Sequence, residues 1–357
     1  MAVAAAKPLA SPKWLLPWLR HAAPPNAEVR TVVVHEGSEL IGIAPFTVQR
    51  GSLGRADYRL FGVPVAERNE PLALPGQEEH VGAEVARVLA NANPRASILA
   101  LEAIDLHSAW PERLARHYPG RARPAVIRGF VLQTPTLQLD EHQSFDHWMA
   151  SRSGNFRSQM QRMRRRLTDD GGIVRMTEAG SDLERDVNSF MRLHLGRWEK
   201  RGGSGLADTG TERMLLEAAN ELLPDGRFRL WLVELKGKPI GAGLFIAGGG
   251  EMAYFNGGFD EEFARYRPAL IPIAAAIEDG FARGDSRLDF GGGPQPYKLR
   301  FADGRAPLAW ISLRPRTARY ALTRAELLTS DLRRSGLSAF HRLPEQQQKQ
   351  VKRLLRR

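Results

Sequence analysis

A carboxylate, a glycine-rich loop, a phenol and an ammonium follow one another within ten residues of this chain. The stretch 289–298 begins at Asp289, continues through three glycines and two prolines, and ends with the neighbouring Tyr297 and Lys298. Glycine lets a backbone approach a ligand closely or adopt positive φ, and proline fixes the loop. These residues follow an apolar strand, so they indicate either a binding site or a wide turn with surface charges.

A second group of reactive side chains lies on a predicted helix that begins at an N-cap Ser181 and ends near residue 200. Spacings of three and four residues put His194, Arg197 and Trp198 on one face of this helix. His194 is able to accept a proton near neutral pH. Arg197 is able to hold a carboxylate or phosphate with two hydrogen bonds. The competing interpretation is that His194 is a hydrogen-bonded core residue.

A third group surrounds the predicted start of a helix over 268–283. The preceding strand ends in two glycines and Asp260, and two arginines follow before the helix begins. A helix N-terminus offers free N–H groups and a partial positive charge, which suit an anion such as a pyrophosphate. Alternatively, Asp260 only caps a turn and the arginines are solvated. The candidate anion-binding residues are Arg265, Arg267, Pro268, Ala269 and Leu270.

The elements that must position these groups show a weak internal repeat. Strands over 30–35 and 40–49 form a predicted hairpin, and so do strands over 229–236 and 239–247. Both second strands contain Ile-Gly with Phe four residues after the glycine, and an aromatic strand follows each pair. This pattern predicts one α/β unit used twice.

Further elements complete each predicted unit. The stretch 134–144 is the expected boundary between the units, and the strand over 287–290 leads into the glycine loop. We expect helices over 78–91, 108–117, 156–167 and 211–223, and strands over 97–103, 125–132, 173–177 and 307–313.

Charge is concentrated in two parts of the chain. The formal net charge is +11, residues 152–166 carry six arginines and no acid, and residues 314–357 carry twelve basic residues against three acids. Each run is a candidate contact for a polyanion or, alternatively, a solvated face. The tail from Arg316 has a helical pattern, and its basic amphipathic end would either lie on an anionic membrane surface or pack on its own domain.

Composition excludes several classes of site and protein. The chain has 357 residues, enough for two domains, and no cysteine, so disulfides and thiolate chemistry are excluded. No apolar run is long enough to span a membrane, and the N-terminus lacks the pattern of a signal peptide. Histidines are scattered without paired metal-ligand spacing, so no metal site is predicted. We expect a cytoplasmic protein, with the basic tail as a means of peripheral contact with the inner membrane.

Taken in order, these motifs resemble one family. His194-x-x-Arg197-Trp198, the glycine hairpin at 237–241, the strand end at 254–260 and the 289–298 stretch resemble the CelD-like acetyltransferases of the GNAT superfamily, which are related to the FemAB aminoacyl-ligases. The resemblance covers about 145–316 and extends more faintly over 14–135. It implies tandem GNAT-like domains, each with a mixed, mostly antiparallel sheet flanked by helices. The implied boundaries are 1–140, 141–316 and a basic helical tail over 317–357.

The resemblance also implies an activity, which is acyl transfer from acyl-CoA, with acetyl-CoA first, to a small-molecule or glycan amine in envelope or exopolysaccharide biosynthesis. The alternatives are a Fem-like transferase that uses aminoacyl-tRNA, bound through the basic helix 157–167, and a GNAT-fold binding protein without catalysis. Under this resemblance the site residues take three roles. His194 or Asp260 would be the base, Tyr297 the proton donor to the leaving group, and Arg197, Trp198, Asp289 and Lys298 would bind substrate.

One departure from the GNAT pattern concerns the donor. The diphosphate loop, Gln or Arg followed by x-x-Gly-x-Gly or Ala, is not visible before the helix expected at Pro268. Relatives often have Pro-Gly at the start of that helix, where this chain has Pro268-Ala269. The sequence therefore leaves the acyl donor open, and it does not indicate the oligomeric state.

Overall fold

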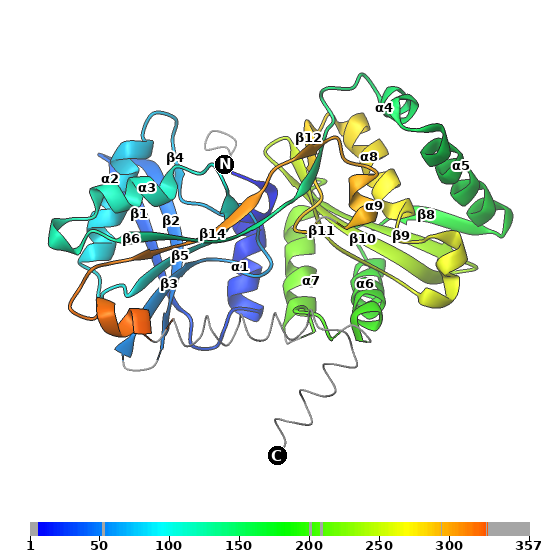
Figure 1. Ribbon diagram of the computed structural model, residues 1–357. Coiled ribbons are helices and arrows are strands. Elements are labelled where there is room, and N and C mark those ends of the chain that lie inside the picture. Colours follow the sequence, from blue (N-terminus) through cyan, green and yellow to red (C-terminus); the bar gives the residue numbers. More distant parts are fainter. Residues whose placement is uncertain are drawn as a thin grey trace, which may run out of the picture.

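The computed structural model describes residues 6–51, 54–199, 202–207, 210–293, 295–325 and 327. Two mixed sheets lie side by side, each flanked by helices (Figure 1). In the part of the chain that the structure describes, all strand pairs are antiparallel except one parallel pair in each sheet. The predicted α/β class, with two mostly antiparallel sheets flanked by helices, is confirmed. Within the described residues, no helix is both long and apolar enough to cross a bilayer.

The first sheet has the order β1-β2-β3-β5-β14-β6, with β4 paired to β2. Helices α2 and α3 pack on it, and their apolar faces meet the inward side chains of its strands. The elements of this half are η1 (Pro8–Ala10), α1 (Pro12–His21), β1 (Glu28–Glu36), β2 (Glu39–Arg50), β3 (Ala56–Leu60), β4 (Leu72–Ala73), α2 (Glu78–Ala90), β5 (Ile98–Asp105), α3 (Trp110–His117), η3 (Gly120–Ala122) and β6 (Ala125–Leu132).

The second sheet has the order β13-β7-β12-β11-β10-β9-β8. Ser153 caps the arginine-rich helix α5 by accepting a hydrogen bond from the backbone N–H of Phe156. The elements here are β7 (Pro135–Gln138), α4 (Phe145–Ser151), α5 (Gly154–Asp169), β8 (Gly172–Met176), α6 (Asp182–Glu199), α7 (Thr211–Leu222), β9 (Phe228–Leu235), β10 (Lys238–Gly248), β11 (Glu251–Phe259), η4 (Glu261–Tyr266), α8 (Ile271–Arg283), β12 (Arg287–Asp289), α9 (Pro296–Leu299), β13 (Gly304–Arg305) and β14 (Leu308–Arg314).

The internal repeat appears as a shared topology. In each half a three-stranded antiparallel meander leads into a helix and then into a strand parallel to the third strand of the meander. The Ile-Gly pairs have a structural reason. A Cβ at Gly42 would overlap Val81 of α2, and one at Gly241 would overlap the carbonyl oxygen of Pro268. Each glycine therefore lets the chain at or just before the following helix pack closely on the second strand.

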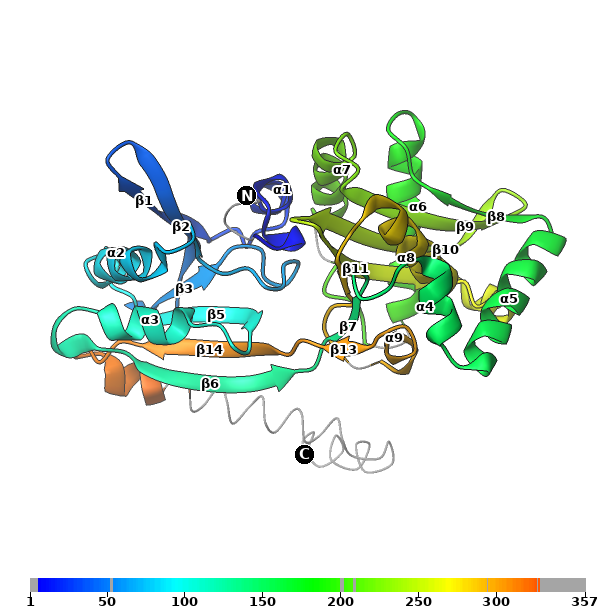
Figure 2. The same cartoon turned by 90° about the horizontal axis from the view of Figure 1, so that it is seen from above.

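The two sheets exchange strands. The last strand, β14, lies between β5 and β6 of the first sheet, while β7 and β13 lie at the edge of the second sheet (Figure 2). The expected strand over 307–313 therefore exists but belongs to the first sheet, and the stretch expected to be a boundary contains β7. Two chain segments thus connect the halves, and neither sheet is made from one continuous half of the sequence.

One apolar cluster joins the halves further. Trp14 and Trp18 of α1 pack in the same buried cluster as Phe190 of α6 and Leu215 of α7. The ring of Trp14 meets the ring of Phe255 edge to face, with centroids 5.0 Å apart. The two halves therefore share a core, and a site between them has walls of fixed position.

Two expectations about helices need correction. Helix α8 begins at Ile271 rather than at Pro268, because Arg267 adopts a left-handed conformation (φ 52°) and residues 268–270 form a turn. The proline in its first turn is Pro272. Helix α4 was not expected. Residues 320–325 are helical, but the tail beyond residue 327, with its predicted amphipathic end, lies outside the described residues.

Candidate active site

A pocket of about 370 Å³ lies where the two parallel strands of the second sheet separate. Pairing between β11 and β12 ends at Ala253 and Asp289, after which β11 continues and the glycine loop leaves the sheet. The opening exposes backbone and side chains from both strands. The pocket is lined by Leu9, Pro64, Val65, Glu67, Arg197, Trp198, Tyr254, Phe255, Asn256, Gly257, Phe290, Gly291, Gly292, Gln295, Tyr297 and Lys298.

Lys298 is a buried ammonium on the wall of this pocket, with 5% of its surface exposed. Its Nζ donates to the carbonyl oxygens of Gly291 (3.3 Å) and Gly292 (2.9 Å) and lies 5.7 Å from the ring centre of Tyr254. Burial lowers the pKa of Lys298 to about 8, although the carboxylates of Glu67 and Asp289 oppose the shift. An ammonium has three N–H donors, so one remains for a ligand.

Tyr297 and Tyr254 form a pair of phenols beside Lys298. Burial raises the pKa of both phenols, so both are neutral near pH 7. A neutral phenol carries one O–H donor. The structure therefore brings a neutral phenol with an available proton beside an ammonium.

Helix α6 places the three predicted residues at different depths. Trp198 and Arg197 both line the pocket, and Trp198 is 36% exposed. The guanidinium carbon of Arg197 lies 4.9 Å from the ring centre of Phe259. His194 is buried and does not line the pocket. Its Nδ1 lies 3.2 Å from the carbonyl oxygen of Gly257 and its Nε2 lies 2.7 Å from the Ser204 hydroxyl.

The partners of His194 define what the ring does in this structure. Both ring nitrogens are engaged, and burial lowers the pKa of the imidazole, so the ring is neutral near pH 7. His194 thus ties the loop at Ser204 to strand β11. A Cβ at Gly258 would overlap the backbone of Leu193 and His194, so this glycine is what lets α6 approach the strand.

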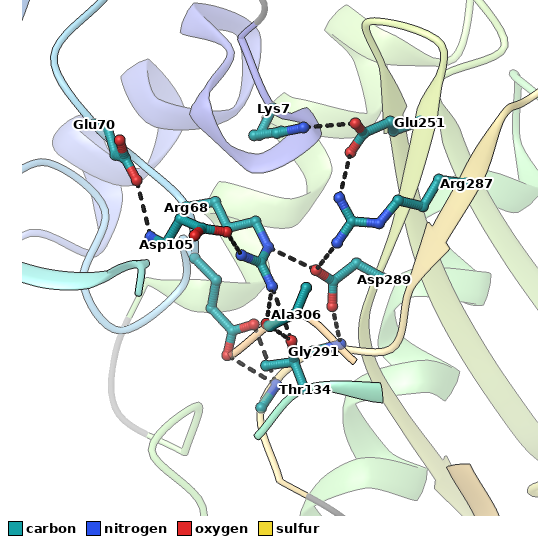
Figure 3. Close-up of polar contacts among 12 residues, drawn as sticks. Lys7, Arg68, Glu70, Asp105, Thr134, Glu251, Arg287, Asp289, Gly291 and Ala306 are labelled. Atoms are coloured by element: carbon teal, nitrogen blue, oxygen red, sulfur yellow. Dashed lines mark hydrogen bonds and ion pairs between the residues drawn. The ribbon is translucent and has the colours of Figure 1, made fainter. Parts of the chain in front are cut away.

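Asp289 lies beside the pocket as part of a buried ion-pair network (Figure 3). Its Oδ2 accepts from Arg68 Nε at 2.6 Å and its Oδ1 accepts from the backbone N–H of Gly291 at 2.9 Å. Arg68 also reaches Asp105 and Thr134 of the first half. Asp289 therefore shapes the glycine loop and joins the halves, and it does not line the pocket.

Glu67 lines the pocket and was missed by sequence reasoning. Both carboxylate oxygens lie 3.1 Å from the backbone nitrogen of Gly292, which donates to them. Burial, reinforced by the nearby Asp289 carboxylate, raises the pKa of Glu67 above its ordinary value. No periodic pattern or motif surrounds Glu67, and the residues it meets lie more than two hundred positions later.

These contacts also decide the role of the glycine loop. The N–H groups of Gly291 and Gly292 are taken by Asp289 and Glu67, and the carbonyl groups of both by Lys298. Gly291 needs its positive φ of 68°, which L side chains rarely adopt. At Gly291 and Gly292 the loop is therefore a wall whose backbone groups are already paired, rather than a cradle for phosphate.

Asp260 is away from this pocket, at the end of β11. Asp260 caps η4, because its Oδ1 accepts a hydrogen bond from the backbone N–H of Glu262. Its Oδ2 lies 3.1 Å from Lys238 Nζ. Burial alone would raise its pKa, but these two partners outweigh it and hold the pKa of Asp260 below its usual value. The structure thus does not bring Asp260 together with Tyr297 and Lys298.

A second pocket, of about 560 Å³, collects arginines from three segments. Arg265 and Arg267 line it together with side chains of α5, whereas residues 268–270 are absent from its lining. Arg162 and Arg267 have no carboxylate within 4.0 Å among the described residues, and no acid lines the pocket. The lining residues are Ser153, Asn155, Gln159, Arg162, Met163, Arg166, Arg265, Arg267 and Arg300.

Comparisons with known proteins identify the fold of the second half. Residues 154–299 match the family model of the acetyltransferase (GNAT) domain. The structure resembles a crystal structure of FemX, with a TM-score of 0.61, 13% identity, and coverage of 86% of this chain and 94% of that one. It also resembles L-PGS from Bacillus licheniformis, with a TM-score of 0.53, 11% identity, and coverage of 89% and 95%.

A third similar structure is the C-terminal domain of a putative lysylphosphatidylglycerol synthetase from Agrobacterium fabrum. Its TM-score is 0.52 at 12% identity, and the match covers 86% of this chain and 88% of that one. At such identities these likenesses show the fold alone. No curated protein sequence matches the chain. The match to the acetyltransferase (GNAT) domain thus covers residues 154–299, which supply most of the residues that line the pocket between β11 and β12.

Proposed function

We propose that this chain is an N-acyltransferase that moves an acyl group, acetyl in the first instance, from acyl-CoA to an amine. The observation that carries the proposal is the neighbouring pair Tyr297 and Lys298 in the opening between two diverging strands of an acetyltransferase domain. A CelD-like role, with an amine acceptor in envelope or exopolysaccharide biosynthesis, is the specific version that the motif order supports.

The pocket holds the groups that direct acyl transfer requires. The amine nitrogen forms a C–N bond to the thioester carbon. As negative charge develops on the carbonyl oxygen, that oxygen accepts a hydrogen bond from the unused N–H of Lys298. The C–S bond then breaks and the Tyr297 hydroxyl protonates the departing thiolate. The proton lost by the nitrogen restores the phenol, so a neutral amine and a thioester give an amide and a thiol.

Several predicted residues take supporting roles in this proposal. Arg197 and Trp198 line the mouth of the pocket and contact the acceptor, while Asp289 fixes the glycine loop through Gly291. His194 positions strand β11 through the carbonyl group of Gly257. Asp260 holds the start of η4 and thereby the loop that carries Arg265 and Arg267.

The arginine pocket supports a phosphate-bearing donor. Free arginines in a concave surface without acids favour a multiply charged anion such as the phosphates of CoA. Helix α9 connects the two pockets, because Tyr297 and Lys298 line one and Arg300, just after the helix, lines the other. A donor with phosphates among the arginines and a thioester at Tyr297 would use both.

Calorimetry with acetyl-CoA and longer acyl-CoAs tests this proposal. We expect saturable binding that weakens at least tenfold in R162A/R267A, since two charge-assisted contacts are lost. R164A is the matched control, because Arg164 lies on the same helix but pairs with Glu278 at 2.5 Å and does not line the pocket. If none of the acyl-CoAs binds, the proposal that the donor is an acyl-CoA is wrong.

One observation favours a second candidate, the Fem-like transferase that uses aminoacyl-tRNA. Arg157 and Arg165 of α5 are exposed and do not line the arginine pocket, so a basic helix face remains for a phosphate backbone. A tRNA gel shift at low salt that weakens in R157A/R165A would support this candidate. If no shift occurs at low salt, tRNA is excluded as the donor carrier.

A further inference from the structure

We propose that Glu67, supplied by the N-terminal half, receives the ammonium form of the acceptor amine and takes its proton before acyl transfer. The inference rests on the proposed N-acyltransferase function and deepens it. It makes Glu67 a catalytic residue, requires both halves for a complete site, and restricts the acceptor to amines that are cationic in solution.

The position of Glu67 is fixed by the structure around it. Its neighbour Arg68, with φ of 57°, donates its backbone N–H to the carbonyl oxygen of Ala103 and its side chain to Asp289. The Trp14 indole donates to the carbonyl oxygen of Val65 at 3.1 Å, and the Asn69 amide donates to that of Phe61 at 2.8 Å. Residues on both sides of Glu67 are thus anchored, and its carboxylate lines the pocket wall.

Glu67 is a carboxylate that lacks a cationic partner. No lysine, arginine or histidine nitrogen lies within 4.0 Å of it among the described residues, and its one hydrogen-bond donor is the Gly292 N–H. Each carboxylate can accept about four hydrogen bonds. A half-buried carboxylate with unused acceptors, in a concave site, is suited to an ammonium ligand.

The rest of the pocket agrees with a cationic ligand. Tyr254, Phe255, Trp198 and Phe290 contribute aromatic side chains to its lining, and aromatic faces attract cations. Lys298 and Arg197 are on the wall as well, so the acceptor's ammonium must approach on the Glu67 side. The charged and titratable groups near Glu67 are Arg68 on its own segment, Asp289 on β12, and Lys298 on α9, while Arg197, Tyr254 and Tyr297 share the lining.

A proton passes from the acceptor's ammonium group to Glu67 before acyl transfer. The ammonium R–NH₃⁺ transfers one proton to the ionised carboxylate, which leaves a neutral amine and a protonated Glu67. The nitrogen lone pair then attacks the thioester carbon, and the later steps proceed through Lys298 and Tyr297 as described above. After product release, Glu67 returns its proton to solvent. The overall reaction therefore consumes an ammonium and a thioester and yields an amide, a thiol and a proton.

The other candidate bases fit this step less well. Both ring nitrogens of His194 are engaged, and Asp260 lies outside the pocket. The Nζ of Lys298 donates to two carbonyl groups, which favours its charged form. Glu67 is the carboxylate that lines the pocket.

The test compares E67Q with E70Q in the full chain. Glu70 is three residues later on the same segment, and burial also raises its pKa, but its oxygens accept from the Asp105 N–H and the Ser108 hydroxyl, each at 2.8 Å. It does not line the pocket. Thiol release from acetyl-CoA would be measured with ethanolamine, glucosamine and lysine as probes, across pH, together with calorimetric binding of acetyl-CoA.

We expect E67Q to lower kcat/KM for the best amine about 10² to 10³-fold, as for loss of a general base. The wild-type rate falls as pH drops through the pKa of Glu67, because the protonated carboxyl accepts no proton, and E67Q should lack this acid limb. Acetyl-CoA affinity should stay within about twofold in E67Q, E67D should recover part of the rate, and E70Q should behave as wild type.

Each other outcome overturns the inference in a recognisable way. If E67Q retains the wild-type rate and acid limb, the assignment of Glu67 is wrong while the acyltransferase proposal stands. If the wild type binds acetyl-CoA but acylates none of the three amines, the cationic acceptor class is wrong. If acetyl-CoA does not bind, the proposed donor fails, and the Glu67 step fails with it.

Discussion

Arg68 and Asp289 form a buried ion pair that joins the two halves of the chain, with 2.6 Å between Nε and Oδ2. Their side chains are 7% and 10% exposed, and 221 positions separate them in the sequence. Arg68 follows Glu67, and Asp289 begins the stretch that carries Tyr297 and Lys298. The pair therefore sets the position of one wall of the pocket against the other.

The first prediction concerns this pair. R68M should lower the free energy of unfolding by about 3 kcal/mol, because it removes the nearer cation from the buried Asp289 carboxylate and leaves Arg287, at 3.3 Å, as its ion-pair partner. The control is R87M, since Arg87 and Glu84 form an exposed pair, and such pairs contribute little to stability. Urea unfolding measures both. Equal effects of the two substitutions would mean that the Arg68–Asp289 pair is not buried in solution.

The second prediction concerns Lys298 and pH. Its pKa is lowered to about 8 in the folded protein, below the usual value for lysine, so the unfolded chain binds more protons between these values. The cost of burying the ammonium is fully present below pH 8 and disappears as pH rises toward 10.5. Urea unfolding of wild type and K298M should show that wild type gains stability relative to K298M across this window. A difference that does not change with pH would contradict the lowered pKa.

The third prediction concerns the approach of α6 to β11. G258A should destabilise the protein by more than about 2 kcal/mol, because the added Cβ would overlap backbone atoms, which cannot give way as a flexible side chain can. The matched control is G196A on α6, where, among the described residues and outside the backbone of its own helix, no heavy atom lies within 4 Å of the added Cβ. Alanine favours a helix over glycine, so G196A should be neutral or slightly stabilising. Thermal unfolding measures the stability of both variants. If G258A lowers the stability only slightly, α6 lies farther from β11 than the structure shows.

The fourth prediction concerns the phenol. Y297F should reduce kcat about 10² to 10⁴-fold with little change in KM, because it removes a proton donor that acts on the leaving thiolate. Y118F, which alters a buried phenol in the core of the first sheet, is the control and should keep the wild-type rate. Steady-state thiol release gives kcat and KM for both variants. If Y297F raises KM and leaves kcat unchanged, Tyr297 binds substrate and does not transfer a proton.

The sequence predicted those parts of the site that are local in the chain. Tyr297 and Lys298 follow a strand within ten residues, so their grouping is visible without a structure. Glu67 and Arg68 act on residues more than two hundred positions later, and pairing at that distance has no local signal. Helix α8 begins three residues later than expected because both Pro268 and Pro272 suit a first turn, and the left-handed Arg267 selects the second.

The topology shows the same limit. The strand at 308–314 was expected from its residues, but its location in the first sheet depends on pairing with β5 and β6. Alternation of apolar residues fixes which face of a strand is buried and does not name its partner. The meander, helix and parallel strand of each half were predictable because their residues are consecutive.

A crystal structure of the protein grown with saturating CoA tests most directly whether both pockets bind the acyl donor. We expect the thiol end in the opening between β11 and β12, within reach of Tyr297 and Lys298, and the phosphates at Arg162 and Arg267. A CoA molecule bound elsewhere, or electron density at neither pocket under saturating conditions, would contradict this expectation.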